Sequence, residues 1–219
     1  IRQPPRYTLF PYTTLFRSGR GIPELRQALV DLAAGKRVRG GTGGFRMPID
    51  RVFTMKGFGT VVTGSVLSGT ARTDERLVLL PQEVEVRVRG VQSHARAVDR
   101  VVAGQRAALN LAGVSVEDVQ RGNVLATPGT LGPTRRMLAR VRMLSSSPTP
   151  LEDRQPLHLH IGTADLVARV ALLEPAPIVP GGEGYVELRL ESPTCARRGD
   201  RFILRRFSPL ATIGGGVIL

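Results

Sequence analysis

The sequence predicts an all-β fold in which two β-barrel domains follow one another, preceded by one α-helix. Short apolar runs recur through residues 45–131, and turn residues separate them at the spacing typical of barrels and sandwiches. Residues 132–219 repeat this pattern. A helical apolar period occurs near the start of the chain instead. We therefore expect a first barrel at 45–131 and a second at 132–219.

Residues 19–44 are expected to hold the helix and a linker. Pro23 suits the first helical turn, and Gly35 is a stop signal. Between them, apolar residues recur every three or four positions and share one face: Ile22, Leu25, Leu29 and Leu32. The basic, glycine-rich residues 36–44 are typical of a linker.

Residues 1–18 differ from the rest of the chain. Tyr-Thr-Leu-Phe nearly recurs as Tyr-Thr-Thr-Leu-Phe, and three prolines interrupt any helix or strand pattern. The string resembles the conceptual translation of a sequencing adapter. Our hypothesis is that this leader is not native, and the alternative is an ordinary flexible terminus.

The first barrel opens with a distinctive stretch from Phe45 to Gly64. Phe45, Met47 and Ile49 alternate with polar or proline positions, which is the pattern of a strand with one buried face. Two glycines then bracket one aromatic residue, as in a turn. The β-branched run that follows predicts a second strand, so we expect a hairpin-like corner of a barrel.

The composition favours a polyanionic partner. The formal net charge is +13, which predicts attraction to tRNA, ribosomal RNA or DNA first and to an anionic membrane second. Trp is absent and aromatics make up 5%, so base stacking on aromatic platforms is not expected. No apolar run approaches the roughly 18 residues of a membrane span. The single cysteine, Cys195, excludes an intrachain disulfide and suits a reducing cytoplasm.

Several motifs carry a resemblance to a known family. The string P-I-D-R-V-F, followed by G-F-G-T-V-V-T-G, resembles the opening of the second domain of translational GTPases. Its Asp-Arg and Lys-Gly pairs resemble the selenocysteine-specific elongation factors in particular. Further segments are similar to the second and third domains of the same family: residues 104–114, 120–136, 158–173 and 199–216.

The resemblance implies barrels of the translational GTPase type, in a chain that begins with the last helix of the GTPase domain. The sequence lacks the phosphate-binding loop G-x-x-x-x-G-K-[ST], Asp-x-x-Gly and Asn-Lys-x-Asp. We therefore expect no enzymatic activity and no cofactor in this chain, whereas GTP and Mg²⁺ serve the full-length family. The domains that bind an mRNA hairpin are also expected to be absent.

The implied function is to bind selenocysteinyl-tRNA and deliver it to the ribosome for UGA recoding, as a cytoplasmic monomer that does not bind membranes. Asp50, Arg51 and Arg106 match the positions that line the aminoacyl pocket in this family. A selenol is largely ionised at neutral pH, so two guanidiniums favour it over neutral serine or a mostly protonated cysteine. Asp50 would orient an arginine or accept the α-amino group. The other interpretation is a surface ion pair.

Two further sets of residues follow from the resemblance. Positions near the tRNA 3′ end are Gly57, Gly59, Asp118 and Arg121. The glycines are otherwise turn or bulge positions. Contacts to the tRNA backbone are assigned to five arginines, which could equally form a solvated face: Arg197, Arg198, Arg201, Arg205 and Arg206.

Two alternatives remain open. The chain could belong to another translational GTPase, of the elongation factor Tu or initiation factor class, and Arg51 with Arg106 is the feature that argues against it. A β-barrel hydrolase would use His158, His160 and Asp165. His158 and His160 share one face of a strand, but without a third ligand from a Cys/His cluster we expect no metal site.

Overall fold

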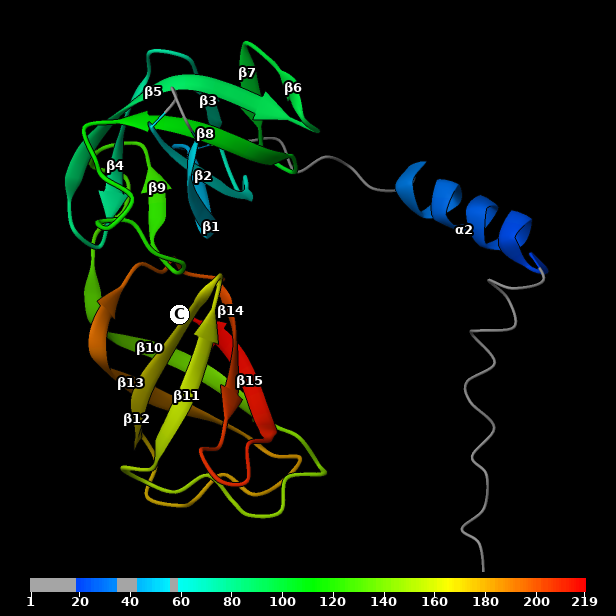
Figure 1. Ribbon diagram of the computed structural model, residues 1–219. Coiled ribbons are helices and arrows are strands. Elements are labelled where there is room, and N and C mark those ends of the chain that lie inside the picture. The colour runs from blue at the N-terminus through cyan, green and yellow to red at the C-terminus, as the bar shows by residue number, and fades with distance from the viewer. Residues whose placement is uncertain (1–18, 35–42, 56–58) are drawn as a thin grey trace, which may run out of the picture. The chain divides into compact units, whose positions relative to one another are not determined.

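The computed structural model describes residues 19–34, 43–55 and 59–219, and these residues form one helix and fifteen strands (Figure 1). The predicted all-β fold, with two barrels and a preceding helix, is confirmed. The leader at 1–18 and most of the linker lie outside the described residues. No helix within the described ranges is long and apolar enough to cross a membrane.

The helix belongs to one of the two units into which the chain divides, and residues 40–219 form the other. The helix is α2, Ile22–Ala34, and it ends one residue before the glycine that predicts its end. The apolar face of α2 is exposed: Leu25, Leu29 and Leu32 are each more than half accessible to solvent. The spacing of the apolar residues is thus enough to predict where in the sequence this helix lies.

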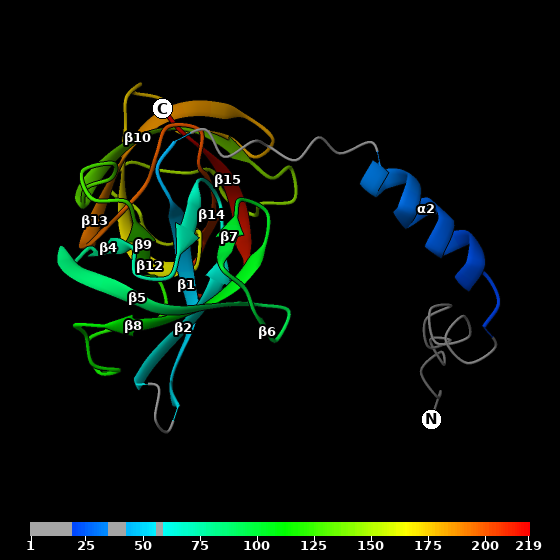
Figure 2. The same cartoon turned by 90° about the horizontal axis from the view of Figure 1, so that it is seen from above.

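The first barrel is a ring of six strands in the order β4-β9-β1-β2-β8-β5, closed by pairing of β4 with β5. Strand β2 pairs with β1 along one edge and with β8 along the other, and Figure 2 labels these three strands. A seventh strand extends β5, and two short strands pair separately as β3–β7. The bounds are β1 Arg46–Met55, β2 Gly59–Ser65, β3 Thr70–Arg72, β4 Arg76–Leu80, β5 Val84–Ser93, β6 Arg96–Ala97, β7 Arg100–Val102, β8 Arg106–Ala112 and β9 Val124–Ala126.

The predicted alternation at the start of the first barrel is confirmed. Phe45, Met47 and Ile49 are each at most 1% exposed and pack in one apolar core with residues of the other strands. The residues between them do not all face solvent, because Arg46 is also buried. Arg46 is covered by the second barrel, where Asp200 binds its guanidinium.

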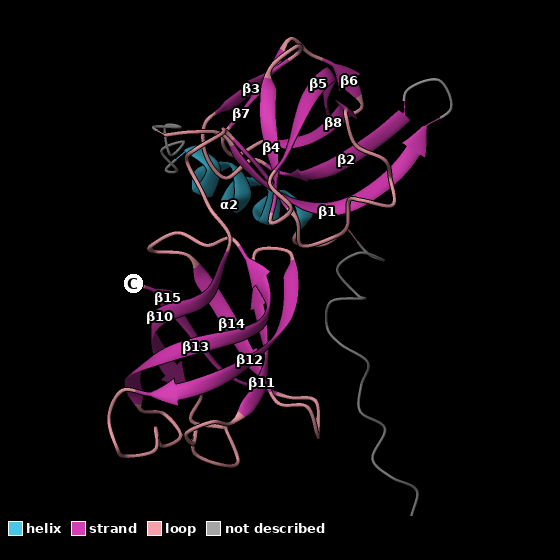
Figure 3. Ribbon diagram, turned by 90° about the vertical axis from the view of Figure 1, so that its left-hand side faces the viewer, coloured by secondary structure: helices cyan, strands magenta, loops and turns pink. Residues whose placement is uncertain are grey.

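The second barrel is closed by six strands in the order β10-β13-β12-β11-β14-β15 (Figure 3). Inward-facing aliphatic residues, with Phe202, fill it. The bounds are β10 Thr134–Met143, β11 Pro156–Ile161, β12 Ala164–Leu172, β13 Glu183–Thr194, β14 Arg201–Arg205 and β15 Thr212–Ile218.

Strand β15 is longer than its propensities suggest. Residues of high strand propensity continue without interruption only from Val217, whereas β15 starts at Thr212 and includes three glycines. The glycines allow close approach of both neighbours: a Cβ on Gly216 would lie 2.1 Å from the carbonyl oxygen of Arg140. Glycine is therefore required here for packing, although its intrinsic strand propensity is low.

The two barrels, which share the unit 40–219, contact one another through a buried ion pair. The Arg46 guanidinium on β1 donates two hydrogen bonds, of 2.8 and 2.6 Å, to the Asp200 carboxylate of the second barrel. Cys195 packs beside this pair with Leu80, Val124 and Ala126 of the first barrel. Burial raises the pKa of the Cys195 thiol to about 11, opposed by the charge of Arg46. Cys195 is thus an interior thiol, protonated at neutral pH.

Candidate functional site

Asp50 and Arg106, both predicted site residues, form a bidentate ion pair on the outside of the first barrel. The two terminal nitrogens of Arg106 donate to the Asp50 oxygens at 2.6 and 2.8 Å. The hydroxyl of Thr63 donates to Asp50 Oδ1 at 2.8 Å. Asp50 is the extra residue of a bulge, because Ile49 and Arg51 pair with the consecutive residues Gly64 and Thr63. The bulge redirects the Asp50 side chain toward β8.

Arg51 follows Asp50 directly and is exposed. The hydrogen bond from Arg106 lowers the pKa of the Asp50 carboxyl, opposed by partial burial and aided by Thr63 and by the charges of Arg106 and Arg51. Asp50 therefore stays ionised well below neutral pH and neutralises about one guanidinium. Two arginines and one carboxylate leave a net charge of about +1 at this site.

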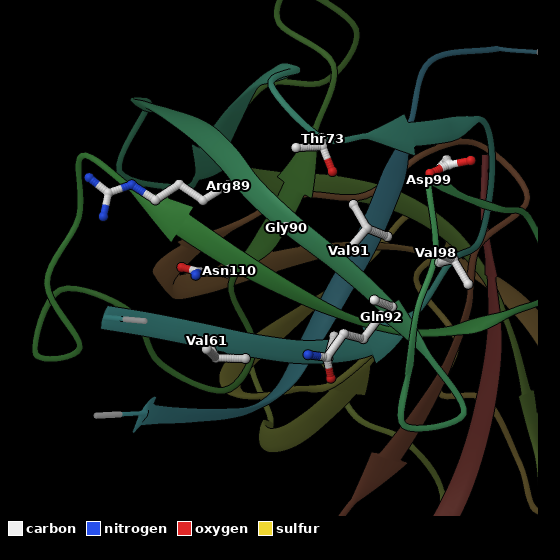
Figure 4. A pocket seen from close by; sticks show the side chains of 11 residues that line it. Val61, Thr73, Arg89, Gly90, Val91, Gln92, Val98, Asp99 and Asn110 are labelled. Carbon is white, nitrogen blue, oxygen red and sulfur yellow. The ribbon is translucent and has the colours of Figure 1, made fainter. Parts of the chain in front are cut away.

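A hollow of about 400 Å³ lies on the same barrel (Figure 4). Val61 of β2, Asn110 of β8 and Gln92 of β5 line it, and Gly90 opens it because glycine has no side chain. The Oδ1 atom of Asn110 is buried without a hydrogen-bond partner among the described residues. An unpaired buried amide oxygen is costly, so it marks a position where a ligand donor would be stabilising.

The ion pair and the hollow share one face of β2 and β8. Along β8, Arg106, Ala108 and Asn110 alternate with the buried residues Ala107, Leu109 and Leu111. Ala108 lies opposite Thr63 and lines the hollow. Asn110 is four residues from Arg106, which is about 13 Å along a strand. The face thus offers a polar, cationic end and a half-apolar hollow within reach of one extended ligand.

The site residues predicted from the sequence do not include those that line the hollow. One signal for it exists: Asn110 is the polar exception among the apolar residues 107–112. However, the sequence does not show that β5, β8 and β2 are neighbours. The lining residues become recognisable as a group only once the strand order is known.

The residues assigned to the tRNA 3′ end have local structural roles. Gly59 begins β2 with a φ of 80°, a backbone conformation that favours glycine. The Asp118 carboxylate accepts bonds from the amide and hydroxyl of Ser115, which lower its pKa. Arg121 donates through Nε to the Thr163 carbonyl of the second barrel at 3.2 Å. Gly57 lies outside the described residues.

The five arginines near the end of the chain occupy two places rather than one. Arg197 and Arg198 precede β14, and Arg201 begins it. Arg197 donates to the Thr130 carbonyl at 3.4 Å, next to the first barrel. Arg205 ends β14, about 13 Å further along the strand, and Arg206 follows it. Sequence proximity therefore overstates how closely these charges gather.

The histidines of the hydrolase alternative do lie together. His158 Nδ1 is 3.1 Å and His160 Nδ1 is 3.8 Å from Asp165 Oδ1. The ring of Phe207 packs on His158 with centroids 4.2 Å apart. Within the described residues, neither histidine is hydrogen-bonded to a Ser, Thr or Cys that could act as a nucleophile. Nor do those residues contain a group of three or more His, Cys, Asp or Glu side chains that could hold a metal ion.

Comparison with known proteins assigns both barrels. Residues 59–126 match the model of elongation factor Tu domain 2, and residues 138–219 match the β-barrel domain of the selenocysteine-specific elongation factor. The chain is 40% identical over 202 residues to the selenocysteine-specific elongation factor of Desulfomicrobium baculatum, covering 92% of this chain and 32% of that protein. The corresponding Escherichia coli K12 protein is 33% identical over 209 residues, or 95% of this chain and 32% of that protein.

Other relatives place these matches in context. Elongation factor Tu 2 of Streptomyces avermitilis is 35% identical over 178 residues, covering 80% of this chain and 45% of that protein. The crystal structure of translation elongation factor SelB from Methanococcus maripaludis, apo form, superposes with a TM-score of 0.81 at 26% identity, covering 93% of this chain and 47% of that one.

A crystal structure of a bacterial selenocysteine-specific elongation factor, EF-Sec, gives a TM-score of 0.79 at 26% identity, over 92% of this chain and 32% of that one. The chain thus spans about a third of the length of the selenocysteine-specific elongation factors of Desulfomicrobium baculatum and Escherichia coli K12. Both barrel matches, the sequence relatives and the solved structures agree, and through its two β-barrels the chain belongs to the family of selenocysteine-specific elongation factors.

Proposed function

We propose that this chain is the aminoacyl-tRNA-binding part of a selenocysteine-specific elongation factor, which delivers selenocysteinyl-tRNA to the ribosome for UGA recoding. The bidentate pair of Asp50 and Arg106 beside Arg51 is the observation that supports this most strongly. Family membership supports the translational role. The sequence contains no phosphate-binding loop motif, so in this proposal the chain binds RNA without hydrolysing GTP, while GTP and Mg²⁺ serve the full-length family.

The aminoacyl end would lie at the cationic end of the β2–β8 face. Asp50 engages both terminal nitrogens of Arg106, which fixes the plane of that guanidinium. The exposed Arg51 carries the second positive charge. With Asp50 ionised, the net charge of about +1 would complement one selenolate anion. Serine, which is neutral, would gain no such interaction.

The hollow at Asn110 would take the terminal nucleoside of the tRNA. Its volume of about 400 Å³, its apolar wall at Val61 and its unpaired Asn110 oxygen suit a base that stacks little but forms hydrogen bonds. The separation of about 13 Å along β8 would let the esterified amino acid reach Arg106. In this proposal Gly57, Gly59, Asp118 and Arg121 lie near the 3′ end of the tRNA.

The arginines of the second barrel would add to the affinity for tRNA, and this part of the affinity would not depend on the attached amino acid. Arg205 is the last residue of β14 and lies opposite His158 of β11, and Arg206 follows it. Arg197, Arg198 and Arg201 lie at the other end of β14. Contacts from either group to phosphates would release counterions, so affinity should fall steeply with salt. The protein would act in the cytoplasm as a monomer.

Changing Arg106 to Ala should weaken binding of selenocysteinyl-tRNA by about 1.5–3 kcal/mol, because a charge-assisted contact is lost. The affinities for seryl-tRNA and for uncharged tRNA should change little, and the slope of affinity against salt should stay nearly constant. The measurement is a binding titration of each tRNA over a salt series.

Arg154→Ala is the matched control for Arg106→Ala. The Arg154 side chain is 92% exposed. Its replacement by Ala removes one positive charge, as Arg106→Ala does, but from the second barrel. We expect Arg154→Ala to leave the preference among the three tRNAs unchanged. Equal weakening of all three tRNAs by Arg106→Ala would mean that Arg106 is only part of the basic surface, and the aminoacyl proposal would then be wrong.

A further inference from the structure

Directly opposed arginines are a recurrent feature of these barrels. Like charges directly opposite one another on neighbouring strands are destabilising, because their Cβ atoms are only about 5 Å apart. Among the strands that the structure describes, four cross-strand positions nevertheless place arginine opposite arginine: Arg76 with Arg87, Arg136 with Arg189, Arg169 with Arg189, and Arg72 with Arg100.

Three of these four pairs are neutralised by carboxylates of the same barrel. Every arginine in them forms an ion pair: Arg76 with Glu85 at 3.2 Å, Arg87 with Asp74 at 2.7 Å, Arg169 with Glu191 at 3.8 Å, Arg189 with Glu187 at 3.1 Å, and Arg136 also with Glu187. Where the fold opposes two arginines, it therefore usually supplies an anion.

The pair of Arg72 and Arg100 is the exception. Both side chains are exposed on the small β3–β7 sheet, while their neighbours Ala71 and Val101 face the core. Neither guanidinium forms an ion pair or hydrogen bond with any residue in the described part of the chain. The nearby carboxylates are engaged elsewhere: Glu75 accepts from the backbone amide of Arg72, and Asp74 pairs with Arg87.

The two arginines also border an open hollow. Arg72, Arg100 and Asp99 line a space of about 430 Å³ on the surface. Asp99 forms no ion pair with a described arginine, so it occupies none of the hydrogen-bond donors of Arg72 and Arg100, although its charge counts in the local sum. Two arginines and one aspartate give a local charge of about +1. That charge complements one singly charged phosphodiester, and two guanidiniums offer enough donors to bind both of its free oxygens.

We propose that Arg72 and Arg100 form a phosphate-binding site on the first barrel, whose ligand is a backbone phosphate of RNA. The site is independent of the proposed aminoacyl site, because it uses other strands and does not recognise an amino acid. The bound phosphate takes the place that a carboxylate holds in the other three arginine pairs. Inorganic phosphate offers the same chemistry, and the experiment below separates the two sources.

The first arm tests phosphate itself. Thermal unfolding of the full chain is compared in potassium phosphate and in potassium chloride at equal ionic strength. Phosphate should raise the midpoint of the unmodified chain more than that of Arg100→Gln, since ligand binding stabilises the folded state. General salting effects of phosphate act on both proteins alike. In chloride, Arg100→Gln should have an equal or slightly higher midpoint, because the repulsion is relieved.

The second arm tests RNA. A short oligouridylate is titrated against the unmodified chain, against Arg72→Ala with Arg100→Ala, and against the control Arg154→Ala with Arg169→Ala. The control also removes two exposed arginines. In the first double variant, the slope of log K against log salt concentration should become shallower by about 0.7, the value for one single-strand phosphate. The slope should change less in the control.

The outcomes are distinct. A phosphate effect lost in Arg100→Gln, together with the reduced salt slope, supports the proposal. A phosphate effect without any change in RNA binding supports the phosphate site and overturns RNA as its source. No difference between the unmodified chain and its variants in either arm overturns the proposal. A lower midpoint of Arg100→Gln in chloride would also contradict it, since Arg100 would then have an internal partner.

Discussion

Replacing Asp200 with Asn should destabilise the two-barrel unit by about 3 kcal/mol, because it leaves the Arg46 guanidinium buried without a counter-charge. The Arg46 side chain is 6% exposed and that of Asp200 is 20% exposed. The carboxylate accepts two hydrogen bonds from Arg46, and Asp200 Oδ2 also accepts one from the amide of Arg197. We expect the thermal midpoint to fall by roughly 6–12 °C in a chain of this size.

Two further variants make the Asp200 test specific. Asp74→Asn breaks an exposed ion pair of similar length, 2.7 Å, and should cost at most about 1 kcal/mol. Replacing both partners, as Arg46→Met with Asp200→Leu, should recover much of the lost stability, because no unpaired charge remains buried. If Asp200→Asn and Asp74→Asn unfold at the same denaturant concentration, the buried pair does not hold the barrels together.

Replacing Gly216 with Ala should destabilise the second barrel by about 3 kcal/mol or more. The added Cβ would lie 2.1 Å from the carbonyl oxygen of Arg140 and 2.7 Å from Cζ of Phe202. Arg140 lies on β10 and Phe202 on β14, the two strands that pair with β15. The added methyl group would therefore force β15 away from β10. The measurement is chemical denaturation followed by circular dichroism.

Gly132→Ala is the control for the glycine test. A Cβ at Gly132 would meet no atom within 4 Å. Its effect should be within about 0.5 kcal/mol, or slightly stabilising. Similar stabilities for Gly216→Ala and Gly132→Ala would show that β15 does not need glycine for close approach to its neighbours.

The sequence predicts the two-barrel fold because apolar alternation depends only on local spacing. Phe45, Met47 and Ile49 show this, since the strand and its buried face both follow from the pattern. The burial of Arg46 does not follow, because it depends on a partner 154 residues away. The glycines of β15 are missed for a related reason: their role is set by the neighbouring strands.

The candidate site divides in the same way. The motif brings attention to Asp50 and Arg106, and the structure places them in direct contact across 56 residues of sequence. The five arginines that are close in sequence separate in space, because β14 runs between them. The hollow at Asn110 needs the order of β5, β8 and β2, which no local pattern encodes. The sequence thus shows which charged residues the site can use, whereas only the fold shows which of them lie next to one another.

Recognition of the selenocysteinyl group by the first barrel can be measured by comparing two charged forms of one tRNA. The same tRNA is charged with selenocysteine or with serine, and each form is titrated against the unmodified chain at neutral pH and constant salt. The RNA contacts are identical, so any difference reports the amino acid alone. We expect selenocysteinyl-tRNA to bind at least about tenfold more tightly than seryl-tRNA, the equivalent of one charge-assisted contact. Equal affinities for the two forms would contradict this recognition.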